Sequence, residues 1–399
     1  MISSERKVFN EQFSAEKYLH FLEILQEGLP EKVGFRVAET PVFISKDLKE
    51  KLVLAGEEIL KTILDPKFKE LTKRAIPKKW EVANETKHPH FIALDFAICK
   101  DENDELIPKL IELQGFPSLY GFQSFLGDCY REAYDLPENM DVYFSGLNKE
   151  SYLQLLKKTI IGPHQPEEVV LMDVDALRQK TVVDFFITQK QLGIPIIPLE
   201  DLKQEGKKLY YFSGNQKVFI KRIYNRLIFD EIDTDPRIFD KVVDIRQDLD
   251  VEWITHPNWF YRISKFTMPF LQSEFVPKTW FLNELPSIPE NLENFVLKPL
   301  FSFAGQGVII DVKETDIETI ADPENWILQE KVNYDPIVQA PDGGVKSEIR
   351  ILYLWPEEDV QPTLAINLAR LSRGKMIGVR YNKDFDWVGG TVAFFPEGS

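Results

Sequence analysis

Two neighbouring runs of strand-like residues constrain the fold of this 399-residue chain more than any other feature. In residues 91–100, FIALDFAICK, large apolar side chains occupy every second position, which is typical of a strand with one buried face. Residues 106–114, LIPKLIELQ, form a second run, and the acidic residues 101–105 separate the two. The pattern predicts two strands joined by a turn, with one face packed on a core.

The other face of these strands carries polar groups. Asp95 lies between Ala93 and Ala97, whose small side chains leave room for a ligand. Glu112 and Gln114 are two residues apart, so they project from one face of their strand. A carboxylate on a partly buried face raises the free energy unless a positive group is close. The sequence therefore predicts a positive partner at this face.

The rest of the chain alternates helical and strand patterns. Residues 14–64 and 262–275 have helical spacing, residues 167–202 read as strand, helix and strand, and Ser213-Gly214-Asn215 predicts a hairpin turn. Strand patterns dominate after residue 295. We expect a multidomain α/β or α+β fold with parallel crossovers in the middle. The expected domains are 1–150, with the helices and the polar strands; 151–262, with the strand–helix–strand unit; and 263–399.

Charge and composition exclude several classes of function. The net charge of −16 and pI of about 5.0 argue against a nucleic-acid partner or a membrane surface, although a local basic cluster could still bind a small anion. The two cysteines give neither a disulfide scaffold nor a zinc pattern, and His88 and His90 flank a proline, which favours a surface turn over a metal site. The first twenty residues lack an apolar run of signal-peptide length, which favours a cytoplasmic location.

Residues 295–312, FVLKPLFSFAGQGVIIDV, place a lysine at the end of a strand before a loop of small residues. Backbone N–H groups in such a loop can approach phosphate oxygens, while the lysine supplies a point charge. No Gly-Lys-Ser/Thr occurs, so the loop is not a P-loop, and strand–loop–strand order would suit a lid. The alternative is an ordinary hairpin with a solvated lysine. The candidate phosphate-binding residues are Lys298, Ser302, Gly305, Gln306 and Gly307.

Further polar residues stand at strand ends. Gln329, Glu330 and Lys331 close an apolar strand, where amide groups could pair with an adenine edge; the alternative is a strand that simply leaves the core. Glu348 and Arg350 share a strand face, which is most often a structural ion pair. Other strands carry basic residues that could equally be solvated: Lys221, Arg222, Arg226, Arg370 and Arg373.

Taken together, these stretches resemble the ATP-grasp superfamily, and within it the circularly permuted branch of glutathionylspermidine synthases and eukaryotic glutathione synthetases. KPLFSFAGQGV resembles the lysine and glycine-rich lid of the family, ILQEKV resembles its adenine hinge, and WFYRISKFTMPFL resembles the segment with a second ATP-contacting lysine, here Lys265. ALDFAI and LIELQGFPSL resemble the two strands that carry the metal ligands.

The resemblance implies ATP bound between two α+β lobes by Lys265, Lys298, the loop and the hinge residues. It implies Mg²⁺ held by Asp95, Glu112 and Gln114. The implied reaction joins a carboxylate to an amine through an acyl phosphate, on a small-molecule or peptide substrate. Arginine pairs bidentately with carboxylates, and the candidates for the substrate carboxylate are Arg222, Arg226 and Arg370.

Two positions depart from the family pattern. The family has asparagine where this chain has Gln114, and glutathionylspermidine synthases have a phosphate-contacting arginine where this chain has Ala93. Two alternatives therefore stay open: a small-molecule kinase on the same scaffold, and a degenerate module that only binds nucleotide or a partner. An unpermuted site would use Glu348 and Asn367 as metal ligands instead, but a pairing of Glu348 with Arg350 disfavours that arrangement.

Overall fold

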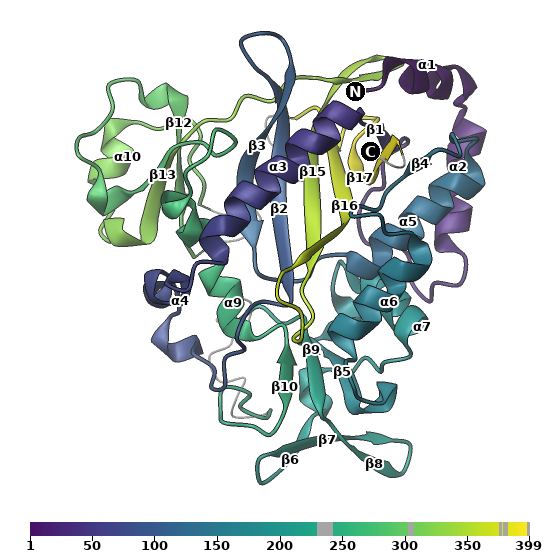
Figure 1. Cartoon of the computed structure of the whole chain (residues 1–399), viewed down its shortest axis with the longest axis vertical. Coiled ribbons are helices and arrows are strands. Elements are labelled where there is room, and N and C mark those ends of the chain that lie inside the picture. The colour runs from purple at the N-terminus through teal and green to yellow at the C-terminus, as the bar shows by residue number, and fades with distance from the viewer. Residues whose placement is uncertain (230–241, 302–306, 375–376, 378–381, 397–399) are drawn as a thin grey trace.

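The structure is a computed structural model that describes residues 1–229, 242–301, 307–374, 377 and 382–396. Its centre is a six-stranded sheet in the order β17-β16-β15-β2-β3, with β14 paired to β15 (Figure 1). All its strand pairs are antiparallel. The strands are β2 (Phe91–Lys100), β3 (Leu106–Gln114), β14 (Val338–Ala340), β15 (Gly343–Leu354), β16 (Thr363–Ser372) and β17 (Gly389–Thr391). The predicted pairing of residues 91–100 with residues 106–114 is confirmed.

Helices cover the apolar face of this sheet. In Figure 1, α3 (Lys46–Ile63) crosses in front of it, and α5 (Tyr120–Ala133) lies beside it, to the right of β16. The Ser45 hydroxyl caps α3 by accepting a 3.3 Å hydrogen bond from the Leu48 N–H group, and the buried residues of α3 recur every three or four positions. Gly56 lets this helix approach closely, because a Cβ there would lie 2.0 Å from the hydroxyl oxygen of Tyr353.

A second unit contains the predicted strand–helix–strand segment. Here β5 (Val169–Met172), β9 (Arg222–Asn225) and β10 (Glu252–Ile254) form a parallel sheet, and α7 (Val182–Leu192) connects β5 to Ile196, which bridges Leu171 in parallel. The predicted turn at residues 213–215 joins β7 (Lys208–Ser213) to β8 (Gln216–Phe219), and β6 (Lys203–Glu205) completes that antiparallel sheet.

A third sheet, in the order β11-β13-β12, lies to one side of the central sheet (Figure 1). Its strands are β11 (Thr279–Phe281), β12 (Phe295–Pro299) and β13 (Trp326–Glu330). The strand expected after the glycine-rich loop is reduced to a single bridge from Ile309 to Leu297. The helix expected over residues 262–275 is also shorter: α9 (Pro257–Arg262) is followed by a 3-10 helix, η7 (Lys265–Phe270), which contains Pro269.

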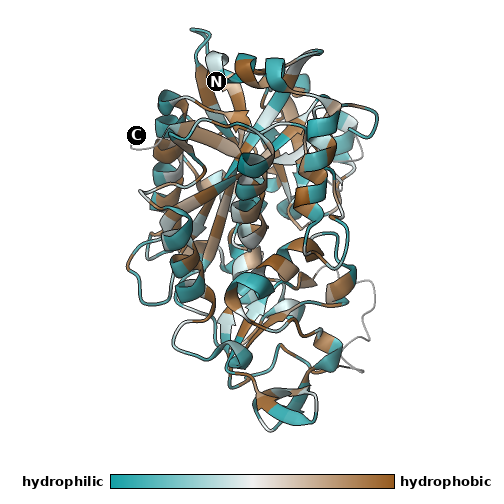
Figure 2. Cartoon of the chain, turned by 90° about the vertical axis from the view of Figure 1, so that its right-hand side faces the viewer, coloured by the Kyte–Doolittle hydropathy of each residue, from teal (hydrophilic) through white to brown (hydrophobic). Residues whose placement is uncertain are grey.

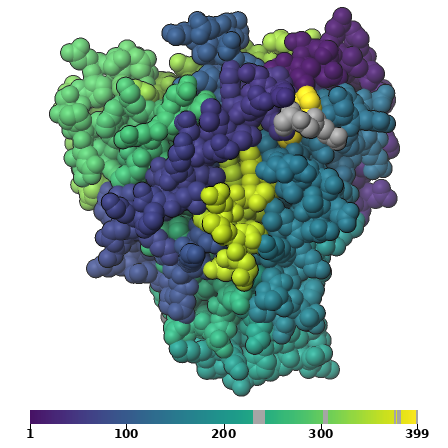
Figure 3. Space-filling model, in the orientation of Figure 1, coloured from purple at the N-terminus to yellow at the C-terminus, as the bar shows by residue number. Residues whose placement is uncertain are grey.

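The remaining elements complete the outer layers. Figure 2 shows hydrophobic residues concentrated on the strands and on the helix sides that face them, and Figure 3 shows late-chain residues filling the surface between the early helices. In the described part of the chain, no helix is both long enough and apolar enough to span a bilayer. The remaining helices and strands are α1 (Ser3–Gln12), α2 (Ala15–Gln26), α4 (Phe68–Leu71), α6 (Lys149–Ile160), α10 (Glu314–Glu318), β1 (Val42–Phe43), β4 (Met140–Asp141) and β18 (Ala393–Pro396).

The central sheet combines strands from residues 91–114 with strands from residues 338–391, and one hydrophobic core joins both segments. The domain boundaries near residues 150 and 262 stay a prediction. One expectation about the surface is wrong. His88 and His90 are buried rather than exposed: the His88 ring stacks on Trp355 at 3.9 Å, and the Nε2 of His90 lies 3.0 Å from a carboxylate oxygen of Glu357.

Candidate functional site

The face of the central sheet opposite α3 carries a charged cluster. Strand register places Glu112 and Arg350 on either side of Asp95, and places Arg370 beside Glu348. In β3 the register shifts next to Asp95, which leaves one extra residue there. With this bulge, Glu112 and Gln114 point to the same face of the sheet as Asp95. The cluster therefore contains side chains from four adjacent strands.

Asp95 is fully buried and has two positive partners. The Nη2 atoms of Arg350 and Arg370 each lie 2.6 Å from its Oδ2, and the Nε of Arg350 donates to its Oδ1. Arg350 also donates to the Ser118 hydroxyl at 2.8 Å. Guanidinium groups, rather than the Mg²⁺ that the resemblance implied, are therefore the positive partners of Asp95 in this structure.

The expected pairing of Glu348 with Arg350 is wrong. Although the two residues share a strand face, Glu348 pairs with Arg370 and accepts a 2.9 Å hydrogen bond from the hydroxyl of Tyr334. The reason is register: Arg350 stands directly opposite Asp95, and Arg370 directly opposite Glu348. Asn367 pairs with Ile351, so it lies on the opposite face from Glu348 and cannot complete a metal site with it.

The cluster shifts the proton affinities of its members. Burial alone would raise the pKa of Asp95, but the charges of Arg350 and Arg370 outweigh it and hold that pKa below its ordinary value. Burial raises the pKa of Glu348, and Arg370 offsets this only in part. Burial likewise lowers the pKa of Lys298, against the opposing charges of Glu112 and Glu348. Burial and the neighbouring charges thus shift the pKa values of Asp95 and Glu348, two carboxylates on one face, in opposite directions.

Glu112 and Gln114 lie on one face, as predicted, and touch each other. The Gln114 side-chain amide donates to the Glu112 carboxylate at 3.0 Å, and Arg350 is 3.8 Å from the same carboxylate oxygen. The Glu112 side chain is 34% exposed, whereas Asp95 is enclosed. Glu112 is therefore the carboxylate of this pair that a ligand can reach.

The third sheet contributes the lysines. The Nζ of Lys298 donates to the Gln329 side-chain oxygen at 2.5 Å and to the backbone oxygen of Ile111, at the β3 bulge, at 3.4 Å. Lys298 thus bridges the third sheet and the polar strand. Lys265, in η7, donates to the Pro299 backbone oxygen at 2.9 Å, just after Lys298. Gln329 is buried, and its side-chain nitrogen has no hydrogen-bond partner in the described part of the chain.

The other expected nucleotide contacts are placed as follows. The backbone N–H groups of Glu330 and Lys331 bond to Lys278 and Asn294 at 2.9 and 2.7 Å, so both are already used within the third sheet. Gly307 has a φ of +71°, and a Cβ there would lie 2.9 Å from Pro299. Ser302, Gly305 and Gln306 lie outside the described residues.

Of the three arginines expected to bind substrate, the structure brings only Arg370 into the cluster. The Arg222 side chain bonds to Glu252 at 2.8 Å and to the carbonyl oxygen of Ile160 at 3.3 Å, where α6 ends. Arg226 is buried and ion-paired with Asp184, whose other oxygen accepts a 2.9 Å hydrogen bond from the Phe122 N–H group.

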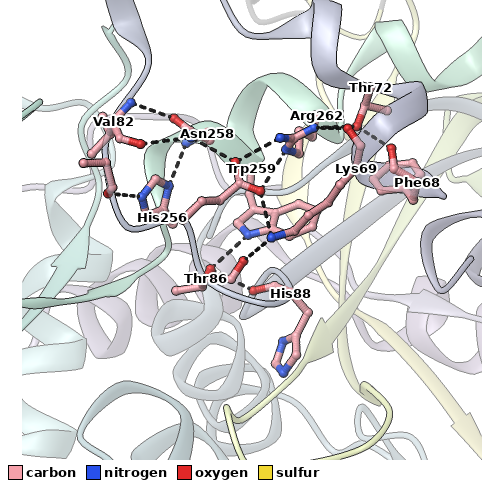
Figure 4. Close-up of polar contacts among 12 residues, drawn as sticks. Phe68, Lys69, Thr72, Val82, Thr86, His88, His256, Asn258, Trp259 and Arg262 are labelled. Atoms are coloured by element: carbon pink, nitrogen blue, oxygen red, sulfur yellow. Dashed lines mark hydrogen bonds and ion pairs between the residues drawn. The ribbon is translucent and has the colours of Figure 1, made fainter. Parts of the chain in front are cut away.

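A separate polar network surrounds the residues of α9 (Figure 4). Arg262 pairs with both oxygens of Glu85 at 3.0 and 3.1 Å, and the Trp259 indole N–H donates to the Thr86 hydroxyl at 2.9 Å. These contacts fix α9, and α9 in turn contacts Gly115. A Cβ on Gly115 would lie 2.5 Å from the Trp259 backbone oxygen, so only glycine fits one residue after Gln114.

The donor chemistry fits a magnesium ion at Glu112 and Gln114. Carboxylate and amide oxygens are ligands that Mg²⁺ accepts, and Glu112 is open to solvent on one side. The fit does not extend to Asp95, because guanidinium groups engage both of its oxygens. Among the described residues, no three His, Cys, Asp or Glu side chains converge on one point.

Sequence reasoning missed Arg350 and Tyr334 as parts of this site. The only signal for Arg350 was its position two residues after Glu348 on a strand, which places it on the polar face without identifying its partner. Tyr334 belongs to the segment between β13 and β14, which carries no strand or helix pattern that would fix its position.

Comparisons with known proteins bear on the fold. No protein-family profile matches the sequence, and no curated protein matches it either. Among solved structures, the apo form of a glutathione synthetase-like effector, GSS30, from Globodera pallida is similar, with a TM-score of 0.61 and 12% identity over 96% of both chains. A provisionally named gamma-glutamylcysteine synthetase from Methylobacillus flagellatus KT gives a TM-score of 0.40 at 12% identity over 86% of both chains, which is too low to argue from. The chain therefore has the mixed α/β, multi-lobed fold of a glutathione synthetase-like structure.

Proposed function

We propose that this protein is an ATP- and Mg²⁺-dependent ligase that joins a carboxylate to an amine. The observation that carries the proposal is the contact between two sheets: Lys298, on the third sheet, reaches the β3 bulge next to Glu112 on the central sheet. A lysine and an accessible carboxylate facing each other across two lobes suit a magnesium–phosphate chain between them. The similar fold of the GSS30 structure supports the same reading.

Each residue has a role in this proposal. Lys298 and Lys265 bind phosphate oxygens as point charges, and Gln329 offers its unpaired amide nitrogen to the nucleotide. Glu112 and Gln114 would hold the magnesium ion, which when bound neutralises phosphate charge. Arg370 has a side chain that is 34% exposed, so it is the arginine best placed to meet a substrate carboxylate.

The proposed reaction needs no nucleophilic side chain. An oxygen of the substrate carboxylate attacks the γ-phosphorus, the bond to the bridging oxygen breaks, and ADP leaves. The amine then attacks the acyl carbon, inorganic phosphate leaves, and the amine proton passes to solvent. The protein's contribution is to position the groups and to neutralise charge.

The test is a screen for ADP release with amino acids, short peptides and polyamines, singly and in pairs, using the wild-type protein and Lys298→Met. Release that requires an acid and an amine together, and that falls at least tenfold in Lys298→Met, is the expected result. A matched control is Lys149→Met, because Lys149 is an exposed lysine paired with Asp128 away from the third sheet. Release unaffected by Lys298→Met would contradict the proposed site.

A second candidate is a degenerate module that binds nucleotide without turnover. The observation in its favour is that Asp95, an implied metal ligand, already has two guanidinium partners. This candidate predicts that ATP binds and that no acid–amine pair releases ADP.

A further inference from the structure

A sheet away from the cluster carries an unusual combination of exposed side chains. The small sheet β6-β7-β8 lies at one end of the longest axis of the molecule, and Figure 3 shows this part of the chain as a projection at the same end. Its inner face is apolar, since Leu209 and Tyr211 are buried in the core of the second unit. Its outer face is formed by every second residue of each strand and faces solvent.

We call this outer face the aromatic–lysine face. Register pairs Tyr210 with Phe219 and with Lys203, and pairs Phe212 with Lys217. Phe212 is 57% exposed and Phe219 is 37% exposed, which is high for large apolar residues side by side. The face consists of Lys203, Glu205, Lys208, Tyr210, Phe212, Lys217 and Phe219.

The charge of this segment is opposite to that of the chain. Residues 203–221 contain five lysines and one glutamate, while the whole chain has a net charge of −16. Two of these lysines are ion-paired, Lys217 with Glu205 and Lys207 with Asp248. Charges more than a Debye length away, about 8 Å at physiological ionic strength, are largely screened, so a surface meeting this end experiences the remaining positive charge of the segment more than the acidic body. The net negative charge, from which we predicted no binding to an anionic membrane surface, therefore does not describe this face.

The packing of lysines on rings decides between possible partners. The Lys217 ammonium lies 4.0 Å from the Tyr210 ring centroid and 4.9 Å from that of Phe219, and Lys208 lies 5.8 Å from the Phe219 centroid. Tyr210 meets both phenylalanines edge to face. Nucleic-acid bases stack on open ring faces, which lysines occupy here. The cores of protein interfaces are depleted of lysine, which argues against a protein partner.

We propose that the aromatic–lysine face docks on an anionic lipid surface. Phenylalanine and tyrosine rings enter the boundary between headgroups and acyl chains, and lysine stems extend along the rings so that their ammonium groups reach anionic headgroups. Position at one end of the molecule lets the face meet a flat surface while the acidic body stays farther away. The docking is peripheral and independent of the proposed ligase site.

The test is sedimentation of the full chain with vesicles of phosphatidylcholine alone and of phosphatidylcholine mixed with phosphatidylserine. Binding to the anionic vesicles only, weakening as salt is added, is expected. Each lysine near such a surface contributes about fivefold to partitioning, so Lys203→Gln combined with Lys208→Gln should reduce it roughly 30-fold. Phe212→Ala combined with Phe219→Ala should reduce it about tenfold without any change of charge.

Matched controls separate the face from general charge and hydrophobicity. Lys7→Gln with Lys46→Gln removes the same charge from exposed helix positions elsewhere, and Leu19→Ala truncates a 61% exposed apolar side chain. These variants should bind as the wild type does. The proposal is overturned if anionic vesicles do not bind, if controls and face variants lose binding equally, or if a single-stranded oligouridylate binds through the same residues and vesicles do not.

Discussion

The buried contact between Asp95 and Arg350 makes a strong prediction about stability. Among the described residues, Asp95 is the one carboxylate within 3 Å of Arg350 and one of two that Arg370 contacts, so Asp95→Asn removes both of these contacts. Removing one partner of a buried ion pair leaves an uncompensated charge, which destabilises a protein by about 3–5 kcal/mol. Arg350→Met should be milder, about 2–3 kcal/mol, because Asp95 keeps Arg370.

The double variant distinguishes a pair interaction from general damage. Asp95→Asn with Arg350→Met removes both charges, so its loss should be smaller than the sum of the single losses by at least about 2 kcal/mol. The assay is urea unfolding followed by tryptophan fluorescence, which the seven tryptophans permit. The half-exposed pair of Lys158 and Asp359 is the control, with coupling below about 1 kcal/mol. Additive losses at Asp95 and Arg350 would refute the buried-pair reasoning.

Three further predictions concern parts that support the site. Gly115→Ala should destabilise the protein by about 2 kcal/mol and weaken nucleotide binding, because its Cβ would meet the Trp259 carbonyl at 2.5 Å; unchanged melting and affinity would contradict this. Burial lowers the pKa of His256 to about 4, whereas in the unfolded chain this histidine takes up a proton near pH 6.5. The free energy of unfolding should therefore fall by on the order of 3 kcal/mol as pH drops from about 6.5 to 4. His256→Gln should flatten this dependence when the free energy of unfolding is measured against pH. Arg222→Met should lower the melting temperature but leave nucleotide affinity unchanged, because Arg222 bonds to Glu252 and the end of α6; weaker affinity would instead place it in the site.

Local patterns predicted the elements that depend on neighbouring residues. The hairpin of β2 and β3, the parallel crossover from β5 and the turn at residues 213–215 all follow from alternation and from turn residues. The α-helix expected over residues 262–275 is interrupted by Pro269 and by a change to 3-10 geometry over Lys265–Phe270. The strand expected after Gly307 is reduced to a single bridge between Ile309 and Leu297 of β12.

Contacts between segments that are far apart in the sequence could not be predicted from the sequence. Arg350 and Asp95 are 255 residues apart, and only the register of β15 on β2 brings them together. His88 was expected at the surface because Pro89 follows it, yet Trp355 covers its ring. A strand face can be read from spacing two residues apart, but the identity of the opposite strand cannot.

The most direct test of the central claim is calorimetric titration of a non-hydrolysable ATP analogue with Mg²⁺. If the nucleotide lies between Lys298 and Glu112, Lys298→Met should weaken binding by about 1–3 kcal/mol, the range for a charge-assisted hydrogen bond. Glu112→Gln should leave metal-free binding unchanged but abolish the gain from Mg²⁺, and Lys149→Met should match the wild type. Absence of binding, or equal losses in all three variants, would contradict a nucleotide site between the central and third sheets.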